Sequence, residues 1–309
     1  MSDTKGGSSL TTKAGDGTRP ECTLTVVIPA FNEEGAIAQE IDHLHAVLGP
    51  SAISYEIIVV DDGSTDRTAE IAAGCRCRLL RQGRNRGYGA ALKRGIREAG
   101  SEWVAITDAD GTYPAEALLP MFELARANDM VVGARTGEDV NIPLARRPAK
   151  WALARLASFL AGVDIPDLNS GLRIMHRREV RRFAHILPDG FSFTTTITLA
   201  HLCRGLTVHY LPIDYKKRVG RSKIRATHAW EFLLLILRVI VFFNPLKVFL
   251  PLGAIPFVAG LAKFAYDITK NNLSESAVMG ILSALVIWAI GLLADQNSRL
   301  GLDREAWPD

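Results

Sequence analysis

The sequence predicts an α/β protein, with a mainly parallel sheet covered by helices on both faces, followed by an interfacial helix and two membrane-spanning helices. Three observations predict it. From residue 23 to about residue 134, short β-rich runs alternate with helical segments, which is typical of a parallel sheet. Three of these runs end in acidic or amide residues. After residue 229 the 309-residue chain becomes strongly apolar, which accounts for a hydrophobic content of 48%.

The elements follow one another along the chain in a regular order. Residues 1–21 are rich in Gly, Ser, Thr and Lys, and we expect a disordered tail there. The apolar runs predict strands at 23–30, 56–61, 77–81, 103–108 and 130–134, and helical patterns predict helices at 33–48, 65–73, 88–99, 114–128 and 144–161. The resulting domains are a sheet domain over 22–225, a juxtamembrane helix over 226–245, two spans over 246–295 and a tail over 296–309.

Acidic and amide residues follow three of the predicted strands. The first run ends in Asn32-Glu33-Glu34, the second in Asp61-Asp62, and the fourth in Asp108-Ala109-Asp110. In open parallel sheets, ligands bind outside the carboxyl ends of the strands, so these three clusters should share one rim. We expect one residue of the Asp61-Asp62 pair to cap the helix at 65–73 and another to contact a ligand.

Asp108 and Asp110 form a candidate metal site. Alternate side chains of a strand face the same way, so the two carboxylates lie on one side with Ala109 between them. Two close carboxylates repel unless a cation lies between them, and hard cations such as Mg²⁺ or Mn²⁺ prefer oxygen ligands. The alternative is a polar strand end that runs into a turn at Gly111. The two upstream acidic strand ends favour the metal site.

The three motifs, in this order, resemble those of family 2 glycosyltransferases, which have the GT-A fold, and within them the polyprenyl-phosphate group that includes dolichyl-phosphate mannose synthase. The resemblance covers about residues 23–225. It implies Mg²⁺ or Mn²⁺ at Asp108 and Asp110, and donor contacts from Pro29, Ala30, Phe31, Asn32, Glu33, Asp61, Asp62, Asp108 and Ala109. Many relatives carry a Gln shortly after Asp-x-Asp. Here Gly111-Thr112 follows, and Thr112 is the candidate substitute, through its hydroxyl or a bridging water.

Two later segments strengthen this resemblance. The segment 167–173 resembles an Asp-x-x-Ser-Gly-aromatic-Arg motif, with Leu172 in place of the aromatic residue. It implies a role for Asp167 near the reacting centre, either orienting the acceptor or acting as a base, and its alternative is an ordinary turn. The run from Arg218 to Lys223 resembles an Arg-x-x-Gly-x-Ser-Lys motif, with one residue instead of two between Arg218 and Gly220. It implies binding of the acceptor phosphate by Arg218 and Lys223, besides attraction to anionic lipid. Arg135 is a further cation for a donor or acceptor phosphate.

Gly87-Tyr88-Gly89 begins the helix predicted at 88–99. Leu92 stands where a dinucleotide fingerprint would need its third glycine. Two interpretations remain open. The backbone N–H groups of this helix start could approach a donor diphosphate, or the glycines could only allow close packing of the helix.

The C-terminal segments predict a membrane protein. Residues 246–266 and 277–294 are each close to the roughly 20 apolar residues that cross a bilayer. Residues 229–243 are too short to span and predict an interfacial helix, or else a helix packed on the preceding domain. Basic residues flank the pair of spans, so both termini and the sheet domain should be cytoplasmic. The two spans resemble those of a bacterial subgroup, which implies the bacterial inner membrane.

Taken with the resemblance, the expected function is metal-dependent, inverting transfer of a sugar from GDP-mannose or a UDP-hexose to a polyprenyl phosphate in the bilayer. The net charge of +3 indicates no nucleic-acid partner, and four cysteines without zinc-ligand spacing indicate reduced thiols. Homo-oligomerisation through the membrane region stays open. The alternatives are a glycosyltransferase for another lipid or glycan acceptor and a non-catalytic membrane scaffold. A processive polysaccharide synthase would need Gln-x-x-Arg-Trp, but residues 296–300 lack the Trp.

Overall fold

The sheet has the strand order β3-β2-β1-β4-β6-β5-β7 in the computed structural model, in which β6 alone runs antiparallel to its neighbours. The structure describes residues 23–135, 155, 158–159, 162–190, 192–215, 234, 237–239, 241–270 and 274–301. Within them the strands are β1 Leu24–Ala30, β2 Tyr55–Asp61, β3 Arg78–Arg81, β4 Trp103–Ile106, β5 Met130–Ala134, β6 Arg173–His176 and β7 Val208–Pro212. The mainly parallel sheet that the sequence predicts is confirmed.

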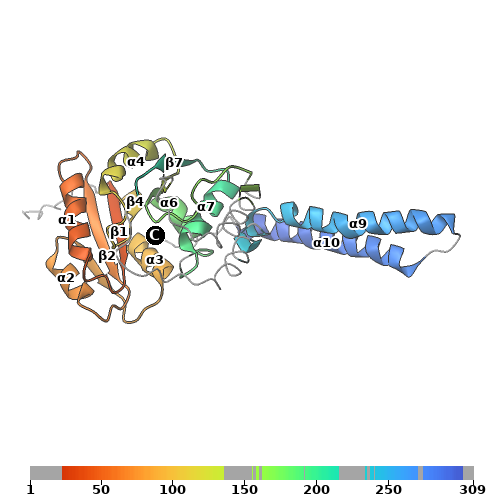
Figure 1. The fold of residues 1–309 in the computed structure, drawn as a ribbon, viewed down its shortest axis with the longest axis horizontal. Coiled ribbons are helices and arrows are strands. Elements are labelled where there is room, and N and C mark those ends of the chain that lie inside the picture. The colour runs from red at the N-terminus through yellow and green to blue at the C-terminus, as the bar shows by residue number, and fades with distance from the viewer. Residues whose placement is uncertain are drawn as a thin grey trace, which may run out of the picture.

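Helices cover both faces of this sheet (Figure 1). They are α1 Ile37–Leu48, α2 Thr68–Gly74, α3 Tyr88–Glu98, the short 3₁₀ helix η1 Ala115–Ala117, α4 Leu118–Ala125, α6 Arg177–Phe183, α7 Phe193–Cys203, α9 Leu246–Thr269 and α10 Glu275–Gly301. Helices α1, α2 and α4 pack with one set of strand side chains, and α3, α6 and α7 pack with the other. On β1, Val26 and Ile28 face the first layer and Val27 faces the second, as the alternation of a strand requires.

The strands predicted from the sequence are all present, and two more were missed. Both missed strands are short: β6 has polar residues at its two ends, and His209 interrupts the apolar residues of β7. The helix predicted from residue 33 begins only at Ile37, because the backbone of residues 32–34 bonds to a neighbouring loop. The helix predicted at 114–128 is split between η1 and α4. The helix predicted at 144–161 lies largely outside the described residues, and Arg155, Ser158 and Phe159 are helical.

The direction of β6 decides where the segment before it lies. Because β6 is antiparallel to β4 and β5, its N-terminal end lies where the parallel strands have their carboxyl ends. Residues 167–172 therefore arrive at the same rim of the sheet as the residues that follow β1, β2, β4, β5 and β7. That rim is where ligands bind in open α/β sheets.

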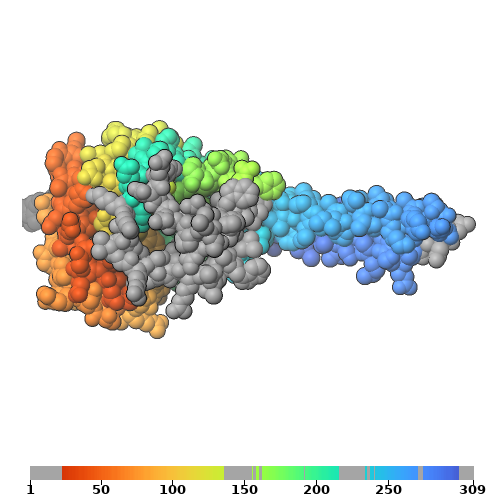
Figure 2. Space-filling view, in the orientation of Figure 1, coloured from red at the N-terminus to blue at the C-terminus, as the bar shows by residue number. Residues whose placement is uncertain are grey.

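Two C-terminal helices pack against each other and project from the sheet domain as a narrow rod (Figures 1 and 2). Leu246–Thr269 and Glu275–Ser298 are long and apolar enough to cross a membrane. Their backbones meet at Gly260 and Gly280, where a Cβ on either glycine would lie 2.9–3.0 Å from atoms of the other helix. The hairpin therefore exposes its apolar side chains outward, as a pair of membrane helices does.

The juxtamembrane segment packs on the sheet domain at its C-terminal end. Val239 and Phe243 are buried in the core beside α6 and α7, and the rings of Phe243 and Phe183 meet edge to face at 5.9 Å. Leu234 and Arg238 are exposed. For these described residues, the arrangement supports the second interpretation of 229–243, a helix packed on the preceding domain.

Candidate functional site

The loops after β1 and β2 are joined by hydrogen bonds. Asn32 Oδ1 accepts from the Thr65 backbone N–H at 2.8 Å, and the Asn32 N–H donates to Ser64 Oγ at 3.0 Å. The Glu33 N–H donates to Thr68 Oγ1 at 2.8 Å. Asn32 has a φ of 56°, a left-handed conformation that Asn tolerates better than most residues. These bonds hold the predicted donor residues Asn32 and Glu33 beside the loop of Asp61 and Asp62.

Asp61 and Asp62 have different surroundings, although both are buried. Asp62 accepts hydrogen bonds from Gln82 Nε2 at 2.9 Å and from two backbone N–H groups, those of Arg86 at 2.8 Å and Gly87 at 2.9 Å. Asp61 Oδ1 accepts from the Ser64 N–H at 3.1 Å. The Asp62 carboxylate is thus engaged in holding the loop before α3.

The expected capping of the helix after β2 by Asp61 or Asp62 is wrong. Asp66 takes this place, because its Oδ1 accepts from the Thr68 N–H at 2.9 Å where α2 begins. Asp66 is nearer in sequence to the helix start, and the turn at Gly63 directs Asp61 and Asp62 elsewhere, with a φ of 73° at Gly63.

Gly87 and Gly89 allow close packing of backbone on α3. A Cβ on either residue would overlap the main chain of residues 188–190. The Gly87 N–H donates to Asp62, and the Ala90 N–H donates to the Asp189 carbonyl at 3.0 Å. Two N–H groups at this helix start are therefore already used, which supports the packing interpretation over diphosphate binding.

Asp108 and Asp110 follow β4 in a turn whose other residues orient them. The Tyr88 hydroxyl donates to Asp108 Oδ1 at 3.0 Å. Burial and the charge of Asp108 raise the pKa of Tyr88 well above its usual value, so this hydroxyl stays a donor. Asp110 Oδ1 accepts from the Thr112 hydroxyl at 2.7 Å and from its N–H at 3.2 Å. Thr112 thus contacts Asp110 directly.

A third carboxyl group, Glu40 of α1, lies beneath this turn. It is 2% exposed, and its Oε1 has no hydrogen-bond partner among the described residues. Burial raises the pKa of Glu40 to about 7, and the charges of Asp110 and Asp108 add to the increase. Glu40 is not among the site residues that the sequence predicts. Its signal is an acidic residue on the apolar face that Ile37, Ile41 and Leu44 define.

The donor set suits a hard cation shared with a ligand. No group of three or more His, Cys, Asp or Glu residues within the described ranges is arranged to hold a metal ion. Asp108 and Asp110, both partly exposed, supply carboxylate oxygens. A cation bound there would complete its shell with oxygens of water or of a ligand, as Mg²⁺ does with substrate phosphates.

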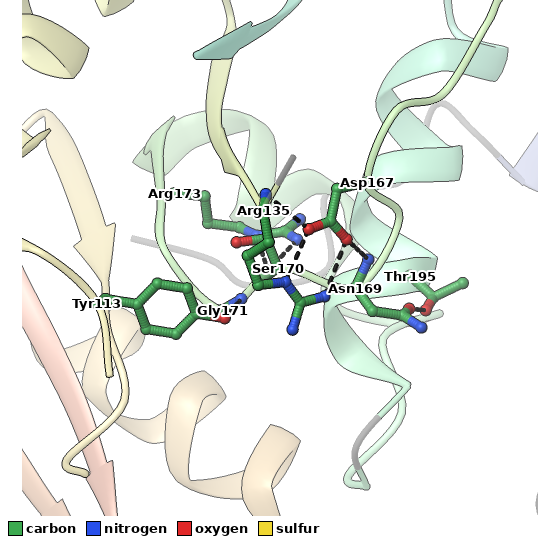
Figure 3. Close-up of polar contacts among 8 residues, drawn as sticks. All are labelled: Tyr113, Arg135, Asp167, Asn169, Ser170, Gly171, Arg173 and Thr195. Atoms are coloured by element: carbon green, nitrogen blue, oxygen red, sulfur yellow. Dashed lines mark hydrogen bonds and ion pairs between the residues drawn. The ribbon is translucent and has the colours of Figure 1, made fainter. Parts of the chain in front are cut away.

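Arg135 and Asp167 form a bidentate ion pair at the same rim (Figure 3). Arg135 Nε donates to Asp167 Oδ2 at 2.7 Å and Nη2 donates to Oδ1 at 2.9 Å. The backbone N–H groups of Arg135 and Asn169 also donate to this carboxylate, each at 3.1 Å. Burial opposes ionisation, but these bonds and the charge of Arg135 outweigh it and hold the pKa of Asp167 below its usual range. Such a carboxylate orients an arginine and is a poor base.

Gly171 connects this pair to the aspartates after β4. Its N–H donates to the Tyr113 hydroxyl at 2.6 Å, and its Cα lies against Asp108, where an added Cβ would be 2.9 Å from Oδ2. Tyr113 also meets the Tyr215 ring edge to face at 5.2 Å, and the Arg135 guanidinium lies 5.4 Å from the centroid of the Tyr215 ring. The sequence does not predict site roles for Tyr88, Tyr113 and Tyr215, because these roles depend on partners that are distant in the chain.

The remaining predicted site residues are placed as follows. Pro29 and Ala30 are buried at the end of β1, Phe31 is partly buried beyond them, and Ala109 is buried between the two aspartates. Arg218 and Lys223 lie outside the described residues. Their predicted contact with the acceptor phosphate stays a prediction.

Comparisons with known proteins fit this geometry. The family model of glycosyl transferase family 2 matches residues 25–188, and the model of the GtrB C-terminal hairpin matches residues 244–300. A dolichyl-phosphate hexose transferase of Haloferax volcanii is 33% identical over 65% of this chain and 86% of its own. A dodecaprenyl-phosphate galacturonate synthase of Rhizobium johnstonii is 25% identical over 93% of this chain and 90% of its own.

A solved structure shares the fold. The glucosyl-3-phosphoglycerate synthase of Mycobacterium tuberculosis, crystallised with Mn²⁺, UDP-glucose and phosphoglyceric acid, superposes with a TM-score of 0.58 at 19% identity. The match covers 71% of this chain and 79% of that one. The sheet domain therefore has the GT-A fold that the sequence predicts.

Proposed function

Because the chain belongs to glycosyl transferase family 2, whose model covers residues 25–188, we propose that it transfers a sugar from a nucleotide-sugar donor to a polyprenyl phosphate. One observation carries the proposal. A rim with carboxylates for a cation and an oriented arginine for a phosphate lies on a domain that continues into two membrane-length helices. The archaeal and rhizobial relatives, both named for polyprenyl-phosphate chemistry, support this acceptor.

The donor lies on the aspartate side of the rim. Asp108 and Asp110 would hold Mg²⁺ or Mn²⁺, which when bound neutralises the donor diphosphate and stabilises the departing nucleotide. Tyr88 and Thr112 orient the two carboxylates for this role. Of the two adjacent aspartates at the end of β2, Asp61 is the better candidate for a contact with the nucleoside, because three donors already occupy Asp62.

The acceptor phosphate lies on the arginine side. A lipid phosphate is anionic at neutral pH, so it needs a cation to hold it near the donor rather than a base to deprotonate it. Arg135 supplies that cation, and Asp167 fixes its direction by the bidentate pair. Arg218 and Lys223, before the membrane hairpin, would complete the phosphate site. Direct displacement at the anomeric carbon then inverts its configuration.

The membrane hairpin brings this rim to the lipid acceptor. The two helices span the bilayer, with the sheet domain and both termini in the cytoplasm of a bacterial cell, because basic residues flank the hairpin. GDP-mannose and UDP-hexoses are the donor candidates.

A transfer assay tests this function. The purified full-length protein in detergent is given polyprenyl phosphate, Mn²⁺ and a panel of radiolabelled nucleotide sugars, and the organic phase is counted. We expect one donor to label the lipid, with loss of the label after chelation of the metal. The Asp110→Asn protein serves as the matched control without activity. Hydrolysis of a donor without label in the lipid, or equal transfer in chelator, would contradict the proposal.

A further inference from the structure

Arg173 is the largest side chain that is completely buried in the described part of the molecule. It begins β6, between β4 and β5, and enters the layer between the sheet and α7. Within the described ranges, the hydrogen-bond partners of its guanidinium are all uncharged. Burying a cation without a paired carboxylate costs several kcal/mol, so an apolar side chain would suit this core position better. Its presence therefore calls for a role other than stability.

The guanidinium of Arg173 joins the 167–171 turn to α7, and Figure 3 shows its contact with Ser170 in the turn. Its Nε and Nη2 donate to the Ser170 carbonyl at 3.2 and 2.5 Å. Its Nη1 donates to the Thr194 carbonyl at 3.0 Å and to Thr198 Oγ1 at 2.9 Å. A second tie between the same two elements runs from Thr195 Oγ1 to Asn169 Oδ1 at 2.5 Å. The turn is thus held on α7 by the side chains of Arg173 and Thr195.

The position of the 167–171 turn limits where the Asp108 carboxylate can lie. Gly171 follows Ser170, and its Cα lies so close to the Asp108 carboxylate that a Cβ would come within 2.9–3.1 Å of three of its atoms. On the other side, the Tyr88 hydroxyl bonds to Asp108 Oδ1. The Asp108 carboxylate therefore lies between the Tyr88 hydroxyl and Gly171. A shift of the Ser170 carbonyl would move Gly171 as well, and the carboxylate could then take another position.

We propose that Arg173 is a positioning residue, which holds the Asp108 carboxylate in the orientation that binds the cation by fixing the Ser170–Gly171 turn on α7. The proposal rests on the proposed function in one respect, because it takes Asp108 as a metal ligand. Arg173 itself touches neither the cation nor a substrate. Its burial lowers the stability of the core, and its hydrogen bonds fix the position of the turn beside Asp108.

The shape of the side chain matters as much as its charge. The planar guanidinium presents its donors in a fixed fork, which here reaches two carbonyls and a hydroxyl on two different elements. A lysine ammonium is a point charge that cannot bridge all three at once. Arg173→Lys should therefore keep only part of the positioning of Asp108. Arg173→Met removes the charge and keeps much of the length, and it should keep none of this positioning.

The test compares metal binding with folding in the full-length protein. Arg173→Met, Arg173→Lys and wild type are assayed by calorimetry for binding of UDP or GDP with and without Mn²⁺, and by thermal unfolding in chelator. The control is Arg94→Met, because Arg94 Nη1 also donates to a carbonyl, that of Arg81 at 2.8 Å, from a partly exposed position on α3. Residues that orient metal ligands change metal affinity on the order of 10- to 100-fold when replaced.

We expect Arg173→Met to unfold within a few degrees of wild type or above it, and to lose about tenfold or more of the Mn²⁺-dependent nucleotide affinity. Arg94→Met should match wild type in binding. A wild-type Mn²⁺ dependence in folded Arg173→Met would overturn the proposal. So would a large fall in unfolding temperature with unchanged binding, since that result would show a structural role alone.

If Arg173→Met does not fold, Thr198→Val and Thr195→Val replace it, because each removes one tie between the turn and α7. Both should weaken Mn²⁺-dependent binding, and wild-type binding in both would overturn the proposal. A failure of the proposed function has a different signature. In that case the wild-type protein itself shows no metal-dependent nucleotide binding, whatever the variants do.

Discussion

Replacing Gly171 by Ala tests the closest approach within the site. A Cβ at this position would lie 2.9 Å from Asp108 Oδ2, 3.0 Å from Oδ1 and 3.1 Å from Cγ. Ordinary van der Waals contacts of a Cβ begin at 3.4 Å, so the carboxylate or the turn must recede by about half an ångström. The backbone of Gly171 does not have a positive φ, so Ala brings no backbone strain of its own.

The size of the effect follows from the tolerance of metal sites. Ligand distances in such sites are held to about 0.2 Å, and the displacement that the new methyl group requires is larger. Misplacement by about 1 Å can reduce a rate on the order of 100-fold. We therefore expect Gly171→Ala to lower kcat by roughly 10- to 100-fold, about 1.4 to 2.7 kcal/mol of transition-state stabilisation.

The assay is transfer of radiolabelled sugar to polyprenyl phosphate across a series of Mn²⁺ concentrations. Gly83→Ala is the matched control, because a Cβ on Gly83 would meet no atom within 4 Å. The Gly171→Ala protein should require more Mn²⁺ for half-maximal activity, whereas Gly83→Ala should not. An unchanged rate and Mn²⁺ requirement in Gly171→Ala would refute the view that this glycine bounds the position of Asp108.

Three further changes test other parts of the site. Asp110→Asn removes a charge from the candidate cation site, so transfer should fall at least 100-fold while the unfolding temperature in chelator stays near that of wild type. Transfer above one hundredth of the wild-type rate would count against the metal role. Arg135→Lys keeps the charge but loses the bidentate bond to Asp167. When each substrate is varied separately, kcat/KM for the lipid phosphate should fall about tenfold, and the affinity for the donor should not change. Burial raises the pKa of Glu40 to about 7 in the folded protein. The stability linked to this shift is fully present below the pKa of the unfolded chain and is lost as the pH rises through the pKa of the folded protein. In chelator, Glu40→Gln should therefore unfold at a higher temperature than wild type at pH 8 and at the same temperature near pH 4; identical curves at both values would contradict the shift.

The parts of the fold that were predictable from the sequence are those with local signals. Central strands such as β1 and β2 are continuous apolar runs, because they are buried on both faces, and the acidic residues that follow them mark the rim. The edge strand β7 and the antiparallel β6 have no such run. In β6, polar residues at both ends leave only Ile174 and Met175 as an apolar run, which is too short to predict a strand. One of these polar residues, Arg173, donates to the Ser170 carbonyl in the turn before the strand.

The roles of individual site residues were less predictable, because they depend on partners far away in the chain. Asp62 looks like Asp61 in the sequence, but only Asp62 accepts from the loop at residues 82–87. The choice between a base and an orienting group for Asp167 depends on Arg135, which lies 32 residues away. Tyr113 and Gly171 are likewise distant, and the sequence carries no spacing rule that would pair them.

The central claim is that the acceptor group is a phosphate. Mass spectrometry of the lipid product tests it most directly, when the purified protein and its preferred nucleotide sugar are given either polyprenyl phosphate or the matching polyprenol without phosphate. We predict that the mass of polyprenyl phosphate increases by one sugar residue and that the polyprenol stays unmodified. Equal modification of the polyprenol, or a product in which the sugar is attached elsewhere than at the phosphate, would contradict the account.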